Sequence, residues 1–322
     1  MHPAISVILL TTLIGVGQGL FVALYATDLL SFLGILPKPE SPFFSYGSAL
    51  VVLFLMGGLL ASFFHLGHPE RAWRAAAMWK TSWLSREVIA LPLAMFFVFV
   101  YGVLHYNNPQ HEFLTLGYDL MLLITGGIGV VAVFLLFLCT GMIYACLRFL
   151  QEWATPLTIV NFTLLGLASG CAFTTAFAVY YAPELVDYFA NWTVVLTLAA
   201  FITRAASLMR NSRIKYKSNL QSAIGIRHNK ITQRSQGLMG GSFNTREFFH
   251  GMSLWFMQKI KWTFLILVFP IPVALLLAGI FTHTAGLFFA AFVVQYLGLL
   301  CERWFFFAQA NHPQNLYYQT IS

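Results

Sequence analysis

The residues of this sequence best suited to chemistry lie between two apolar segments, within residues 65–87. His65 opens this stretch, Arg71 follows, and Ser85 and Glu87 close it. An imidazole and a carboxylate can each give or accept a proton, and a carboxylate partly withdrawn from water holds its proton more tightly. Glu87 directly precedes an apolar run. We therefore expect Glu87 to pair with His65 and exchange protons with a quinone, while Arg71 positions a quinone carbonyl or keeps Glu87 ionised.

A structural interpretation of the same residues is also open. Ser85 suits the N-cap of a helix and Glu87 its first turn, where a carboxylate offsets the helix dipole. Gln18 is a lone amide among small residues in the first apolar segment. Its position favours an interhelical hydrogen bond over a ligand contact, because small residues allow two helices to approach closely.

The composition predicts which solvent surrounds these residues. Of 322 residues, 59% are hydrophobic and 9% are charged, whereas about 25% are charged in an ordinary soluble domain. A membrane span needs about 20 apolar residues. Eight stretches qualify, and we predict an all-α, single-domain membrane bundle over residues 1–322 with spans at 4–26, 44–65, 87–105, 114–147, 157–181, 188–209, 262–282 and 285–307.

Charge predicts the orientation of the bundle. With eight spans, 17 of the 18 Lys and Arg residues fall on the side of the N-terminus, and only Lys38 falls on the other. Basic residues near span ends stay in the cytoplasm. Both termini are therefore expected in the cytoplasm. Because the basic residues follow the positive-inside pattern of a membrane protein, the net charge of +7 does not suggest a nucleic-acid partner. A basic loop at about 210–261 is expected to contact either anionic membrane lipid or a soluble partner.

Metal cofactors are not expected within this subunit. No two of the four cysteines have the CxxC spacing of a zinc or iron–sulfur site. His65 and His105 end spans on opposite sides of the membrane, so they cannot share one haem iron. His105 and His283 both lie near the side of the membrane opposite the N-terminus. Both are at span ends, where histidines commonly meet water. We therefore predict a chain without haem, iron–sulfur cluster or other metal.

The motifs resemble a known family. His65-Leu66-Gly67-x-Pro69-x-Arg71-Ala72, Ser85-x-Glu87 and Gly17-Gln18 are similar to the membrane-anchor subunit of dimethyl sulfoxide reductase. This resemblance implies a haem-free anchor that exchanges electrons between membrane quinone (ubiquinone or menaquinone) and an iron–sulfur subunit with four [4Fe-4S] clusters. That partner is in turn linked to a molybdopterin-containing catalytic subunit. The quinone-binding residues it implies are Gln18, His65, Gly67, Arg71, Ser85, Arg86 and Glu87, with Glu87 and His65 transferring protons.

Two departures refine this resemblance. Arg86 stands between Ser85 and Glu87, and the 210–261 loop is longer and more basic than expected of the reductase anchor. The cytoplasmic side also carries the expected site. These features resemble the anchor of a cytoplasmic, quinone-dependent sulfite dehydrogenase in a bacterial inner membrane, with both partner subunits in the cytoplasm. The alternatives are a dimethyl sulfoxide or polysulfide reductase anchor running quinol oxidation, a secondary transporter, and an anchor without quinone chemistry.

Overall fold

The protein folds into a bundle of long apolar helices. A computed structural model describes residues 1–107, 115–232, 234 and 247–317, and no strand occurs among them. Eight helical segments in this part of the chain are long and apolar enough to span a membrane. The predicted all-α class and the number of spans are therefore confirmed.

The helix bounds follow the apolar segments closely. The spanning helices are α1 (Ile5–Phe32), α2 (Ser41–Phe63), α3 (Trp83–Tyr106), α4 (Thr115–Ala145), α5 (Pro156–Tyr181), α6 (Val186–Ser212), α9 (Leu254–Val268), α10 (Pro270–Thr282) and α11 (Ala285–Ala308). Short helices in the connections are η1 (Pro69–Met78), η3 (Pro183–Leu185) and α7 (Leu220–Ile224), and η5 (Pro313–Tyr317) follows the last span.

The seventh span differs most from its prediction. It begins at Leu254 rather than at 262, and it is broken into α9 and α10 at Phe269, just before Pro270. A proline has no N–H to donate and interrupts the helix before it. Both ends of the predicted 210–261 loop are helical, because α6 continues to Ser212 and α9 begins at Leu254. Lys259, for example, lies on α9 over the ring of Trp255, with its Nζ 3.9 Å from the ring centroid.

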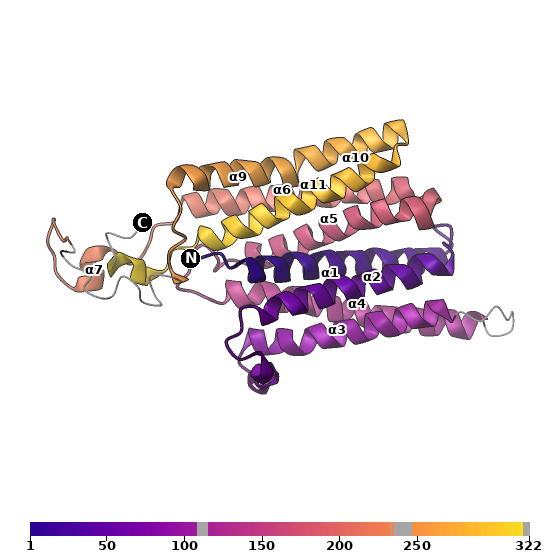
Figure 1. The fold of residues 1–322 in the computed structure, drawn as a ribbon, viewed down its shortest axis with the longest axis horizontal. Coiled ribbons are helices and arrows are strands. Elements are labelled where there is room, and N and C mark those ends of the chain that lie inside the picture. The colour runs from indigo at the N-terminus through magenta and orange to yellow at the C-terminus, as the bar shows by residue number, and fades with distance from the viewer. Residues whose placement is uncertain (108–114, 233, 235–246, 318–322) are drawn as a thin grey trace.

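The spans form two groups of four. In the first, α1 packs on α2 and α4, and α3 packs on α2 and α4. In the second, α5 packs on α6 and α11, while α9 and α10 cover α11. Helices α1 and α5 run side by side through the middle of the molecule and join the groups (Figure 1).

The contact between α1 and α5 is a glycine crossing. Gly15 and Gly19 on α1 face Gly166 and Gly170 on α5, and each pair is four residues apart. A Cβ atom placed on Gly19 would lie 2.3 Å from the carbonyl oxygen of Gly166. No side chain fits there, so the two backbones are in direct contact, as in small-xxx-small helix pairs of membrane proteins.

Both chain ends of the described region meet at one end of the bundle (Figure 1). The amino group of Met1 donates to the carbonyl of Ala310 at 2.8 Å, and the amide of His2 donates to the carbonyl of Glu247 at 2.9 Å. At the same end, Tyr216 donates to Glu152 at 2.6 Å. Burial and this bond raise the pKa of Tyr216 to about 12, so the phenol stays a neutral donor. This end of the molecule is called the terminal end below.

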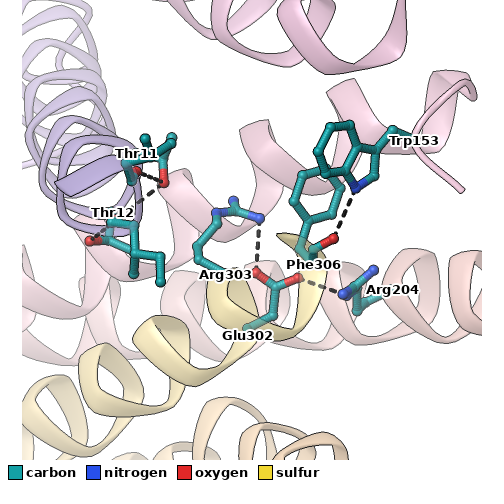
Figure 2. Close-up of polar contacts among 9 residues, drawn as sticks. Thr11, Thr12, Trp153, Arg204, Glu302, Arg303 and Phe306 are labelled. Carbon is teal, nitrogen blue, oxygen red and sulfur yellow. Dashed lines mark hydrogen bonds and ion pairs between the residues drawn. The ribbon is translucent and has the colours of Figure 1, made fainter. Parts of the chain in front are cut away.

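An ionic cluster ties α6 to α11 (Figure 2). Glu302 forms an ion pair with Arg204, with 2.8 Å between Nε and Oε1, and its other oxygen accepts a hydrogen bond from Arg303 Nη1 at 2.8 Å. All three side chains are buried. Two guanidinium groups thus share one carboxylate. The ring of Phe162, 3.7 Å from the Arg303 guanidinium carbon, supplies an aromatic face for the surplus positive charge.

The glycine crossing makes a stability prediction. Gly170→Ala places a Cβ 2.3 Å from backbone atoms of Gly19 and Leu20, so α1 and α5 must separate. We expect the free energy of unfolding to fall by about 1–3 kcal/mol, the usual cost of overpacking, measured by denaturation in detergent. Gly57→Ala is the control, since its Cβ would meet Leu13 at an ordinary 3.5 Å. Equal stability of the two variants would contradict a tight crossing.

Candidate functional site

An apolar cavity of about 220 Å³ lies at the terminal end of the first helix group, between α1, α2 and α3 and beneath η1. Leu10 and Ile14 of α1, Leu59 of α2, and Leu84 and Leu91 of α3 form much of its wall. Such walls exclude water and suit a flat, apolar ring with an apolar tail. The polar side chains on the wall are Ser62, His65 and Glu87. The structure therefore brings His65 and Glu87 to one cavity.

The start of α3 determines where Glu87 lies. Ser82, in an extended conformation, is the N-cap, and its hydroxyl accepts the amide of Ser85 at 3.3 Å. The predicted N-cap at Ser85 is therefore wrong, because the helix begins at Trp83 and Ser85 lies inside its first turn. Glu87 stands one turn deeper than predicted, beyond the free amides that a helix dipole would offer it.

Glu87 is buried, and its partner comes from another helix. Thr140 on α4 donates its hydroxyl to Glu87 Oε1 at 2.5 Å. Among the described residues, no cation forms an ion pair with Glu87. A buried carboxylate without a countercharge is costly. Such a group is suited to taking up and releasing a proton.

His65 stands at the mouth of the cavity. It follows the end of α2 at Phe63, so it lies outside the helix, and its ring is partly exposed. Partial burial lowers the pKa of His65 below its ordinary value. The imidazole is therefore neutral near pH 7, with one N–H donor and one free lone pair. It can pass a proton between water and a ligand in the cavity.

The two arginines predicted to bind quinone, Arg71 and Arg86, contact other groups instead. Arg71 lies on η1 and pairs with Glu70, with 3.6 Å between Nε and Oε1. Arg86 donates to the carbonyls of Trp79 and Lys80 at 2.9 and 2.8 Å, and so ties the connection after η1 to α3. Neither side chain lines the cavity. Arg86 contributes to the cavity only indirectly, because it holds the segment after η1, and η1 carries Trp73, which lines the cavity.

The remaining predicted ligands lie outside the cavity wall. Gln18 donates to the carbonyl of Val133 on α4 at 3.0 Å, which is the interhelical bond that its surroundings favoured. The backbone amide of Ser85 bonds to the N-cap, and Gly67 faces open space.

Sequence reasoning missed Thr140, Trp73 and Pro92. Thr140 is one of several threonines in apolar runs, and no local pattern marks it as the partner of Glu87. Trp73 lies in the connection between two spans, where the sequence pattern does not indicate that its side chain lines a cavity. Pro92 lies inside α3 and lines the cavity, and a proline within an apolar span was the one visible signal.

The two histidines that the haem argument considered, His105 and His283, occupy positions that packing and turn geometry explain. His105 Nε2 lies 3.2 Å from Asp28 Oδ2, which also accepts the hydroxyl of Tyr101 at 2.9 Å. The His105 ring stacks on Phe44, with 4.4 Å between centroids. His283 ends α10 in a left-handed conformation, with φ of 51°. Within the described residues, no group of three or more His, Cys, Asp or Glu side chains is arranged to hold a metal ion.

Two comparisons relate the chain to known proteins. The family model described as "DMSO reductase anchor subunit (DmsC)" matches residues 1–226, which include the cavity and the first six spans. A sulfite dehydrogenase subunit of Allochromatium vinosum is 51% identical over 325 aligned residues, which cover 100% of both chains. With one family model matching well over half of its length, this chain belongs to the family of dimethyl sulfoxide reductase anchor subunits.

Proposed function

We propose that this subunit anchors a sulfite-oxidising molybdoenzyme in the bacterial inner membrane and reduces quinone in the cavity between α1, α2 and α3. The observation that carries the proposal is Glu87, a buried carboxylate on the wall of an apolar cavity, which forms no ion pair within the part of the chain that the structure describes. The name of the Allochromatium vinosum relative, a sulfite dehydrogenase, supports sulfite as the substrate of the complex. Electrons then run from the partners into quinone.

The chemistry divides between apolar and polar residues. Reduction of a quinone consumes two electrons and two protons, and aliphatic side chains hold the ring but supply no proton. Glu87 donates one proton to a quinone oxygen. The resulting carboxylate is then reprotonated from the mouth of the cavity. Thr140 occupies one oxygen of Glu87, which leaves the other for the ligand. His65, neutral and exposed at the mouth of the cavity, relays protons from water.

The terminal end is proposed to face the cytoplasm. All cations of the described loops except Lys38 belong to the connections at this end, and Lys38 pairs with Asp119 at 3.0 Å on the other. The positive-inside rule supports this orientation. Protons for quinone reduction then come from the cytoplasm, and the partner subunits dock there.

The region around α7 is the proposed docking surface for the iron–sulfur subunit, which carries the [4Fe-4S] clusters and connects to a molybdopterin subunit. Tyr317 donates to the carbonyl of Ala223 at 2.9 Å, and Asn315 donates to that of Phe248 at 3.0 Å. These bonds give the region a folded shape. It lies beyond the ends of the spanning helices (Figure 1), which favours a soluble partner over lipid headgroups.

Glu87→Gln tests the site. The amide keeps the size of the side chain and can still accept the bond from Thr140, but it cannot transfer a proton. We expect sulfite-to-quinone turnover to fall at least about tenfold, while sulfite oxidation with a soluble artificial acceptor stays normal.

The matched control for this variant is Glu70→Gln, which removes a carboxylate on η1 that is 61% exposed and outside the cavity wall. It should leave quinone turnover unchanged. Normal quinone turnover in Glu87→Gln would show that the reaction takes place elsewhere.

Cysteine labelling tests the orientation. In a variant with Cys146 and Cys301 replaced by alanine, a cysteine at Ser218 should be protected from a membrane-impermeant maleimide in intact cells. A cysteine at Glu40, at the opposite end of the bundle, should react. Both positions are exposed. Labelling at Ser218 and protection at Glu40 would reverse the proposed orientation.

Charge neutralisation tests the docking surface. Replacing Arg227, Lys230 and Arg234 with glutamine should release the iron–sulfur subunit from membranes, most clearly at raised salt, because screening weakens the remaining attraction. The control replaces Arg213, Lys215 and Lys217, which carry equal charge close to the end of α6. Full retention of the partner by the first variant would assign the loop to lipid.

A further inference from the structure

Pro92 changes the hydrogen bonding of α3 next to Glu87. It lies inside the helix, well past the first turn. A proline has no N–H, so the carbonyl four residues earlier loses its helical donor. That carbonyl belongs to Val88, and Val88 and Pro92 both line the cavity. Residues four apart share one helix face. The freed carbonyl of Val88 therefore lies on the face of α3 that borders the cavity.

The other hydrogen-bond acceptors on the cavity wall are side-chain atoms. The hydroxyl of Ser62 donates its proton to the carbonyl of Leu59 at 2.6 Å, so toward a ligand its oxygen can only accept. One oxygen of Glu87 is occupied by Thr140. An unpaired carbonyl away from water costs free energy unless a donor satisfies it. The Val88 carbonyl is thus an available acceptor within a single residue of the proton-transferring carboxylate.

A carbonyl distinguishes the two redox forms of the ligand. Quinone oxygens are acceptors and cannot bond to another acceptor, whereas each hydroxyl of quinol is a donor. Only the reduced ligand can satisfy the carbonyl of Val88.

We propose that the Val88 carbonyl, freed by Pro92, binds a hydroxyl of quinol and gives the cavity a preference for quinol over quinone. This inference rests on the proposed function. A net hydrogen bond stabilises by about 0.5–1.5 kcal/mol, so it strengthens quinol binding by about two- to tenfold relative to quinone. Bound quinone is correspondingly easier to reduce, which suits an enzyme that delivers electrons to the quinone pool.

Two substitutions at position 92 separate the hydrogen bond from the shape of the proline ring. Pro92→Ala restores the N–H donor to the Val88 carbonyl. Lactic acid at position 92, introduced by nonsense suppression, replaces the amide with an ester that lacks both the N–H and the ring. Leu91→Ala is the control, because it trims the cavity wall without changing backbone bonds. The purified complex is titrated with a short-chain benzoquinone and, without oxygen, with its quinol, each displacing a fluorescent quinone-site inhibitor.

The proposal expects Pro92→Ala to raise the Kd for quinol about two- to tenfold, with the Kd for benzoquinone nearly unchanged. The lactic acid variant should keep the wild-type ratio of the two constants, and Leu91→Ala should weaken both forms alike. An unchanged ratio in Pro92→Ala, or an altered ratio in the lactic acid variant, would overturn the role of the carbonyl.

The outcome for the proposed function is separate. If neither quinone nor quinol displaced the inhibitor from the wild-type complex, the quinone site itself would be disproved, and this inference with it. If wild type binds both forms and only the Pro92 results fail, the quinone site stands and the carbonyl has no part in it. Reaction of each variant with a soluble acceptor confirms that the complex has assembled.

Discussion

The backbone contact between α1 and α5 is the constraint on which the rest of the structure depends. Four glycines bring these helices together without intervening side chains, so their relative rotation and depth are restricted. Helix α1 also packs on α2, α4 and α11. Its rotation therefore directs Leu10 and Ile14 into the wall of the cavity and Gln18 toward α4. In a bilayer the hydrophobic effect does not drive helices together, so such close packing contributes much of the association.

Three buried carboxylates lie inside the spans that the structure describes, and two of them have a cationic or potentially cationic neighbour. Asp28 is bonded to Tyr101 and His105, and Glu302 lies between Arg204 and Arg303. Each of these carboxylates has a potential or permanent cation beside it, as burial in low dielectric demands. Glu87 has only a threonine hydroxyl among the described residues. An acid that is kept buried without a countercharge is poorly justified by stability, which supports the proton transfer that we propose for Glu87.

The connection between α2 and α3 links this acid to the outside of the bundle. Helix η1 has no buried residue of its own, and Arg86 holds its end through two backbone carbonyls. Trp73 and Ala72 line the cavity from η1, and His65 lies just after the end of α2 at Phe63. The motif residues between 65 and 87 thus contribute in two ways. Some face the cavity, and others hold in place the segment that covers it.

The sequence alone determined the number of spans, their approximate bounds and the clustering of charge at one end, and it singled out His65 and Glu87, which both line the cavity. These are local properties, since hydropathy and charge are read along the chain. The tertiary structure decided the rest. Thr140 meets Glu87 across 53 positions, Arg71 turns to Glu70, and Gln18 reaches Val133. Such contacts depend on how each helix is rotated about its axis, and that rotation is set by packing against neighbours that a single segment does not contain.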